Sequence, residues 1–293
     1  MDFSIGLPNT VAGVTRASLL EWARRADARG FAGVGSLDRL VYANYEPLVS
    51  LAAVAAVTEH VRLNTQVLLL PWRLNAALVA KQVATVQHLS NGRVVLGVAP
   101  GGREDDYAAS GATMKGRGGR LAEMVEEMLR IWDGEERGTA GAIGPPLDEV
   151  GRPGLLVGGG VEASLRRAAK LADGWTAGGL PPDRFAQAAE AVRAAWRDEG
   201  RDGNPRLTAL AYFALGPTGA QDAAHDLEHY YAWLGDQTAA AIAGSAATDE
   251  DTVRAYAEAF EQAGCDELTF FPTSTDPQQV DLLADVLGVR ARA

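Results

Sequence analysis

Short apolar runs alternate with longer segments of helical periodicity along the whole chain, and this alternation limits the possible folds more than any other feature. Between the runs, apolar residues recur at the spacing of one helix face, as Leu19, Ala23 and Ala26 do. Parallel strands need crossover connections, so strands that alternate with helices indicate a parallel sheet. The expected strands are residues 3–8, 33–37, 62–70, 93–99, 154–160, 174–179, 206–215 and 267–273.

Eight such units in 293 residues predict an α/β fold, a (β/α)8 TIM barrel that forms a single domain over residues 1–293. An open doubly wound sheet is the alternative. In a barrel, chemistry is expected on residues that directly follow the carboxyl end of each strand. Those positions are Pro8, Asn9, Asp38, Arg39, 69–73, 100–106, 158–161, Gly178, Gly179, Gly216 and 272–274.

Composition excludes several classes of protein. The net charge of −11 argues against a nucleic-acid partner, which would require a clustered basic face. The single cysteine, Cys265, allows neither a disulfide framework nor a thiolate metal cluster, and we expect no metal site. No apolar run is long enough to span a membrane, and the N-terminus lacks the pattern of a signal peptide. A soluble cytoplasmic protein is therefore expected.

The stretch LSNGRVVLGVAPG, residues 89–101, links a helix to a buried strand through an Asn91-Gly92 turn. Its valines and Leu96 fill a barrel, while the residues at 97 and 99–102 are small. Small residues at the end of a strand let a flat ligand approach the backbone. The pattern predicts a ligand-binding loop over the mouth of the barrel.

The same stretch lies within a longer resemblance. The segments VLLLPWRLNAALVAKQVATVQHLSNGRVVLGVAPGGREDDYAASG and RGGRLAEMVEEMLRIWDGE resemble the bacterial luciferase-like flavin and deazaflavin oxidoreductases. SLDRL after the second strand and LLVGGGVEASLRRAAKLADGW agree with it. The resemblance covers most of residues 1–180 and thins afterwards.

The resemblance implies a homodimeric enzyme that holds coenzyme F420 or FMN at the barrel mouth and transfers a hydride to or from a small organic substrate. An FMN-dependent monooxygenase is the alternative within the family. Composition rich in Ala, Arg and Gly, as in high-GC actinobacteria, favours F420. In this family the third strand often ends in a non-prolyl cis peptide behind the cofactor ring, and Gln66–Val67 is the matching bond.

A glycine turn at the end of the fifth strand is the expected phosphate site. The family places the cofactor phosphate at Gly158, Gly159, Gly160 and Val161, where a helix begins with free backbone N–H groups. A turn that serves tight packing alone is the alternative. Glu162 opposes the phosphate interpretation, because a carboxylate on the first helical turn would repel phosphate if it pointed inward.

Three residues are candidates for catalysis: Asp38, Arg39 and Arg103. The deazaflavin branch of the family often has Asp-His after the second strand, so Asp38 matches and Arg39 replaces the histidine. Arginine cannot act as a general acid near neutral pH, but it could hold an anionic cofactor or substrate. A surface salt bridge is the alternative for Asp38 and Arg39. Arg103 lies in the loop that contacts cofactor and substrate in the family.

A barrel that binds a ligand without catalysis is the alternative from a different functional class. Two features point to it. The connection at residues 133–154 lacks the hydrophobic insertion that covers the active site in the family, and Arg39 stands in place of the histidine.

Overall fold

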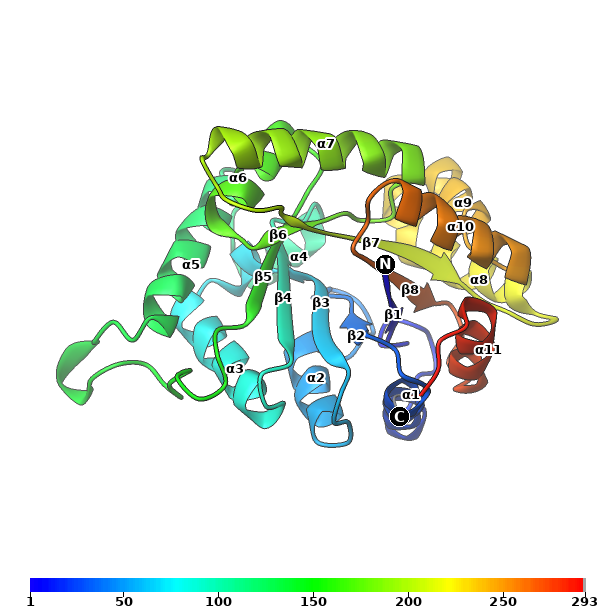
Figure 1. Ribbon diagram of the computed structural model, residues 1–293, viewed down its shortest axis with the longest axis horizontal. Coiled ribbons are helices and arrows are strands. Elements are labelled where there is room, and N and C mark those ends of the chain that lie inside the picture. Colours follow the sequence, from blue (N-terminus) through cyan, green and yellow to red (C-terminus); the bar gives the residue numbers. More distant parts are fainter. Residues whose placement is uncertain (292–293) are drawn as a thin grey trace.

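The chain folds into a closed barrel of parallel strands surrounded by helices (Figure 1). The computed structural model describes residues 1–291. Each strand pairs with the next in the sequence, and β8 pairs with β1 to close the sheet. This order confirms the TIM barrel and excludes the open sheet. Within the described residues the strands are β1 (Asp2–Gly6), β2 (Gly33–Ser36), β3 (Arg62–Leu69), β4 (Val94–Ala99), β5 (Gly154–Gly158), β6 (Gly174–Thr176), β7 (Arg206–Phe213) and β8 (Glu267–Pro272).

Helices connect the strands, as the alternation in the sequence predicts. Between β7 and β8, the segment 218–243 is divided into three helices, α8, η3 and α9. Gly235 lies between η3 and α9 with a φ of 87°, which a glycine adopts readily. The helices are α1 (Arg16–Arg29), α2 (Pro47–Ala55), η1 (Leu70–Arg73), α3 (Ala76–Leu89), α4 (Glu104–Ser110), α5 (Arg117–Trp132), η2 (Gly138–Ala140), α6 (Glu162–Leu171), α7 (Pro182–Asp198), α8 (Gly219–Tyr231), η3 (Ala232–Leu234), α9 (Asp236–Gly244), α10 (Glu250–Gln262) and α11 (Gln278–Leu287).

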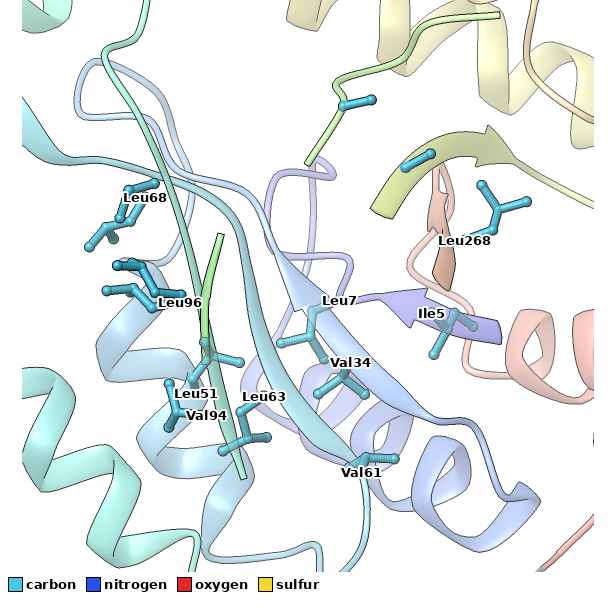
Figure 2. Packing of buried hydrophobic residues seen from close by; sticks show 14 of the residues in the cluster. Ile5, Leu7, Val34, Leu51, Val61, Leu63, Leu68, Val94, Leu96 and Leu268 are labelled. Carbon is cyan, nitrogen blue, oxygen red and sulfur yellow. The ribbon is translucent and has the colours of Figure 1, made fainter. Parts of the chain in front are cut away.

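The main hydrophobic core lies between the strands and the surrounding helices. Figure 2 shows Val34, Leu63 and Val94, from three adjacent strands, in one cluster with Leu51 of α2. All four side chains are almost completely buried. Burial of this apolar surface drives the helices onto the barrel.

Arg93 follows the polar turn in residues 89–101 and anchors the start of β4. Its guanidinium donates hydrogen bonds to the carbonyl oxygens of Thr58 and Val61 at 2.7 and 2.8 Å. It therefore ties the start of β4 to the connection between α2 and β3. Asn91 and Gly92 both have positive φ, which allows the chain to turn sharply before the strand.

A buried charge cluster occupies the end of the barrel where the strands begin. Glu267 of β8 accepts hydrogen bonds from Asn64 at 2.8 Å and Arg62 at 3.0 Å, and from Ser4 and Arg206. Burial by itself raises the pKa of Glu267, but the arginines and the hydrogen bonds outweigh it and the pKa lies below its ordinary value. The cluster therefore links strands β1, β3, β7 and β8.

The connection between α5 and β5 does not lie where the sequence interpretation placed it. A connection from a helix to a strand lies at the end where strands begin, opposite the mouth. The segment packs on α3, where Lys81 donates to Gly144 O at 3.1 Å and Gln87 to Gly151 O at 3.0 Å. Figure 1 shows it extending away from the barrel beside α3 and α5. The expectation that its shortness uncovers the mouth is therefore wrong.

We expect Glu267→Gln to lower the free energy of unfolding by about 3 kcal/mol at pH 7, because it leaves two half-buried arginines without their buried partner. The lowered pKa of Glu267 means that its contribution is complete above pH 4.5 and is lost as the pH falls further. Urea unfolding should therefore show a smaller difference in the free energy of unfolding between the parent and Glu267→Gln at pH 3.5 than at pH 7.

Glu261→Gln is the matched control. Glu261 pairs with the N-terminal amino group at 3.3 Å, but its side chain is 65% exposed. Exposed pairs contribute little, so its effect should stay below about 1 kcal/mol. Equal effects of the two substitutions would contradict a structural role for the buried cluster.

Candidate active site

A pocket of about 210 Å³ opens at the carboxyl end of the barrel. The ends of β2, β3, β6 and β7, the loop after β4, and the elements α8 and η3 all contribute side chains or backbone to it. The pocket therefore lies where barrel enzymes bind their ligands. Its lining is Leu37, Asp38, Arg39, Gln66, Val67, Leu69, Gly101, Gly102, Arg103, Gly178, Gly179, Leu210, Tyr212, Tyr230, Tyr231 and Trp233. We call it the mouth pocket.

Asp38 is one of the predicted site residues in this lining, and both of its carboxylate oxygens have partners. Its Oδ2 accepts a hydrogen bond from Leu69 N at 2.8 Å, and Arg73 lies 3.0 Å from both oxygens. Burial raises the pKa of Asp38, and the charge of Arg73 opposes that rise. Asp38 thus fixes the end of β3 beside the pocket.

Arg39 lies in the mouth pocket and is only 6% exposed. Its Nε is 3.5 Å from Asp106 Oδ2, and its Nη2 donates to Val41 O at 3.1 Å. The guanidinium carbon lies 5.0 Å from the ring centre of Tyr42 and 5.3 Å from that of Tyr230. Within residues 1–291, its Nη1 has no hydrogen-bond partner. Two aromatic rings and one carboxylate therefore stabilise the buried charge, and the Nη1 group is still available as a hydrogen-bond donor.

Asp106 of α4 organises the loop around Arg39. Its Oδ1 accepts hydrogen bonds from the backbone N–H groups of Leu40 and Val41, at 3.0 and 2.7 Å. Its side chain is almost completely buried. A run of charges such as residues 104–106 usually forms a solvated face, but the carboxylate of Asp106 is turned inward, where these backbone donors hold it.

Arg103, also predicted, lines the mouth pocket from the loop after β4. It forms an ion pair with Asp105, and its guanidinium carbon lies 5.1 Å from the ring centre of Trp233 in η3. The contact joins the loop after β4 to the helices that follow β7. Arg103 therefore contributes both positive charge and part of the cover of the mouth.

Gln66 and Val67 line the pocket from β3, and the peptide bond between them is cis, as the resemblance suggested. Gln66 is 7% exposed, and no residue of the described chain bonds to its Oε1. An acceptor oxygen without a partner at this depth calls for a ligand N–H or O–H group.

The predicted phosphate site lies at the junction of β5 and α6. Gly158, Gly159, Gly160 and Val161 are absent from the lining of the mouth pocket within the described chain. In the same part of the chain, no side chain caps the start of α6. Glu162 is turned along the helix and pairs with Arg166 at 2.5 Å, so its carboxylate does not point back over the glycine turn.

Six lining residues were not singled out from the sequence: Leu37, Leu210, Tyr212, Tyr230, Tyr231 and Trp233. Leu37 follows an apolar strand, Tyr212 and Leu210 end another, and the other three belong to a segment that resembles a surface helix. The hydroxyls of Tyr212 and Tyr231 are 2.6 Å apart and form a hydrogen bond. The adjacent aromatics in HYYAWL were the only signal, because a solvated helix rarely has three large rings so close together.

Neither a metal site nor a membrane span is found in the part of the chain that the structure describes. No group of three or more His, Cys, Asp or Glu side chains among residues 1–291 could hold a metal ion. His229 instead shares a hydrogen bond with the Tyr42 hydroxyl at 2.9 Å. Among the same residues, no helix has the length and apolar character needed to cross a bilayer.

Comparison with known proteins defines the class of this barrel. Residues 1–280 match the luciferase-like monooxygenase family, and the chain belongs to that family. An uncharacterised protein of Mycobacterium tuberculosis is 35% identical over 173 residues, which are 56% of this chain and 61% of that protein. The F420-dependent glucose-6-phosphate dehydrogenase of Amycolatopsis mediterranei is 35% identical over 123 residues, 39% of this chain and 37% of that enzyme. The chain thus matches less than two thirds of either relative.

Solved structures share the fold across the full length. A monooxygenase of Streptomyces bottropensis, RslO1, superposes with a TM-score of 0.78 at 23% identity, covering 99% of this chain and 97% of its own. An F420-dependent secondary alcohol dehydrogenase superposes with a TM-score of 0.80 at 17% identity, covering 98% of both chains. At these identities the likeness establishes the barrel and its arrangement.

Asp226 of α8 has a half-buried carboxyl in this region, and its charge adds to the effect of burial in raising the pKa of Tyr42 and Tyr212. Burial raises the pKa of Asp226 from its ordinary 3.8 to about 7. The folded protein therefore holds a proton here that the unfolded chain releases between pH 4 and 7, and folding is opposed once the carboxyl ionises.

We expect Asp226→Asn to raise the free energy of unfolding by about 2 kcal/mol at pH 8, because the amide avoids the buried charge. The gain should shrink as the pH falls from 7 to 4, where Asp226 is protonated in the folded protein. Thermal unfolding across this range is the measurement. Glu228→Gln, an exposed position on the same helix, is the control and should change stability by less than about 0.5 kcal/mol. A gain independent of pH would contradict the explanation.

Proposed function

We propose that the protein is an F420-dependent oxidoreductase that transfers a hydride between the deazaflavin and a small organic substrate at the mouth pocket. Membership of the luciferase-like family supports an oxidoreductase. The F420-dependent dehydrogenase of Amycolatopsis, similar over 39% of this chain, supports the choice of cofactor. The observation on which the proposal rests is that Arg39 and Gln66, two buried polar side chains with unpaired hydrogen-bonding atoms among residues 1–291, line the same pocket.

The residues present fit a flat ring with a polar edge. Arg39 offers an N–H donor with positive charge, and Gln66 offers an acceptor oxygen. Gly178 and Gly179 line the pocket, and a Cβ at Gly178 would meet nothing within 4 Å in the described chain. Backbone without side chains gives a planar ring room to lie close. When bound, the deazaflavin would supply or accept the hydride.

The chain's own residues would then bind and orient the cofactor. Arg39 would hold negative charge at the ring edge, and its burial among Tyr42, Tyr230 and Asp106 strengthens that interaction by excluding water. Asp38 would position the end of β3 through Leu69 N. The glycine turn at Gly158–Val161 would hold the phosphate by its N–H groups.

Two alternatives to an F420-dependent enzyme are an FMN-dependent monooxygenase and a non-catalytic barrel. FMN presents a similar planar ring, so an FMN-dependent monooxygenase is the second candidate and is tested with the same titration. The non-catalytic barrel loses one of its two supports, because α8 and η3 cover the mouth in place of the 133–154 connection. A single domain over residues 1–293, a homodimer and a cytoplasmic location remain predictions.

The first test is a fluorescence titration of the protein with F420 and with FMN, repeated for Gly160→Asp. We expect F420 to bind the parent more tightly than FMN, and Gly160→Asp to weaken F420 binding at least tenfold through repulsion of its phosphate. The φ of Gly160 lies outside the left-handed region, and a Cβ added there would meet no atom of residues 1–291 within 4 Å, so the substitution should not disturb folding.

Gly160→Ala is the matched control, since it adds the Cβ without the charge and should bind F420 normally. Equal affinities of the Asp and Ala variants would remove the phosphate from this turn. Binding of neither cofactor by the parent protein would overturn the proposed function in favour of the non-catalytic barrel. Tighter binding of FMN would favour the monooxygenase.

Arg39 provides a second test. Arg39→Ala should weaken F420 binding and, where its charge stabilises the transition state, lower kcat by about 10²-fold. Arg39→His should introduce a pH dependence between pH 6 and 7, because histidine titrates there and arginine does not. Cofactor Kd, the pH profile and the thermal midpoint are measured together. Lower thermal midpoints with unchanged Kd would show that Arg39 is structural.

A further inference from the structure

A second cavity, of about 410 Å³, lies beside the mouth pocket. It is bounded by β7, the loop that leads into α7, and the helices α9 and α10, which Figure 1 shows beside β7. Its walls are mainly apolar, with Leu210, Ile242 and Phe260 among them. Within residues 1–291, no Asp, Glu, Lys, Arg or His side chain lines it. We call it the side cavity.

The side cavity adjoins the mouth pocket directly. Gly179, Leu210, Tyr212 and Tyr231 line both spaces. The hydrogen bond between the hydroxyls of Tyr212 and Tyr231, 2.6 Å long, therefore lies at the junction. Tyr212 is 6% exposed and Tyr231 is half-buried, so this polar pair is largely shielded between an apolar space and a charged one.

We propose that the side cavity binds the uncharged, apolar body of the substrate, and that the Tyr212–Tyr231 pair binds a substrate oxygen at the junction. The inference rests on the proposed function, because it assumes that the reaction takes place in the mouth pocket. It names the substrate class as an apolar compound with a single carbonyl or hydroxyl oxygen near one end.

The absence of charged side chains from the lining, in the part of the chain described, decides what can enter. A phosphate or carboxylate there would lose its hydration without gaining a counter-charge, which is strongly unfavourable. The anionic parts of the cofactor therefore do not belong in this cavity. An apolar group gains by leaving water, and a cavity of this size and lining is typical of small-molecule sites.

The tyrosine pair can serve a substrate oxygen because one hydroxyl proton remains free. Burial raises the pKa of both tyrosines, so both stay protonated near neutral pH. In the pair, one hydroxyl donates to the other, and the second still has a proton to donate. That proton can hydrogen-bond a carbonyl or hydroxyl oxygen that reaches the junction from the side cavity.

The test uses 4-phenyl-2-butanone, an uncharged ring with a ketone at the other end, and calorimetric titration. Ala241 of α9 lines the side cavity and is exposed at the helix surface, so Ala241→Trp should fill the cavity without disturbing the fold. We expect it to weaken ketone binding at least tenfold. Ala240→Trp, on the next exposed residue of the same helix and outside the cavity lining among residues 1–291, should bind like the parent.

Tyrosine variants test the polar end. Tyr231→Phe should weaken ketone binding several-fold, because it removes a hydroxyl from the junction. Tyr256→Phe should not, because Tyr256 also lines the cavity but its hydroxyl donates to Ser245 O at 2.7 Å. The Kd for F420 should be the same in Ala241→Trp, Ala240→Trp and Tyr256→Phe, because none of these three residues lines the mouth pocket within residues 1–291.

Equal ketone affinities for Ala241→Trp and Ala240→Trp, or no ketone binding by the parent protein, would overturn the inference. Displacement of the ketone by F420 would overturn it too, because the cofactor would then occupy the side cavity. Failure of the proposed function would look different: neither F420 nor FMN would bind, while the ketone would still bind and respond to Ala241→Trp.

Discussion

Closure of the parallel sheet is the constraint on which the rest of the molecule depends. Once β8 pairs with β1, every strand ends at the same face, and residues far apart in sequence meet there. Leu37, Gln66 and Tyr212 reach one pocket only because their strands close into a ring. At the opposite face, Glu267 bonds to side chains of three other strands, so the charges that stabilise the barrel are kept away from the pocket.

Buried polar side chains occur at both ends of the barrel. Around Glu267, four side chains supply hydrogen bonds to one carboxylate. At the mouth, Arg39 and Gln66 keep open hydrogen-bonding atoms, by the contacts among residues 1–291. Buried polar groups are usually paired, so an unpaired one needs an explanation. Among the described residues, unpaired atoms also occur around Glu267, at Arg62, Asn64 and Arg206, so what distinguishes Arg39 and Gln66 is that they line the mouth pocket, where barrel enzymes bind their ligands.

The loop after β4 and helix α4 contact both the loop after β2 and η3, and these contacts cover the mouth. Asp106 of α4 binds the backbone of Leu40 and Val41, and Arg103 packs on Trp233 of η3. The net charge of the chain is −11, yet Arg39 and Arg103 face the pocket and the carboxylate in its lining, Asp38, already pairs with Arg73. Arg39 and Arg103 have carboxylate partners as well, Asp106 and Asp105, so the charges around the pocket balance locally despite the acidic surface.

The sequence by itself determined the barrel, the family and the residues that follow each strand. Strand and helix periodicities are local properties, and a closed parallel sheet then fixes which ends of the strands meet. Asp38, Arg39 and Arg103 were found in this way, and Gln66 and Val67 through the family resemblance. All five line the mouth pocket.

Only the tertiary structure decided what lies over those residues. The partners of Arg39, which are Tyr42, Tyr230 and Asp106, come from three separate segments, and nothing in their local sequence links them. The sequence did not show that the tyrosines of α8 line a pocket. Helical spacing indicates which residues share a face but not what that face contacts. The position of the 133–154 connection was misjudged for a related reason, since the end of the barrel on which a connection lies follows from chain direction in the closed sheet.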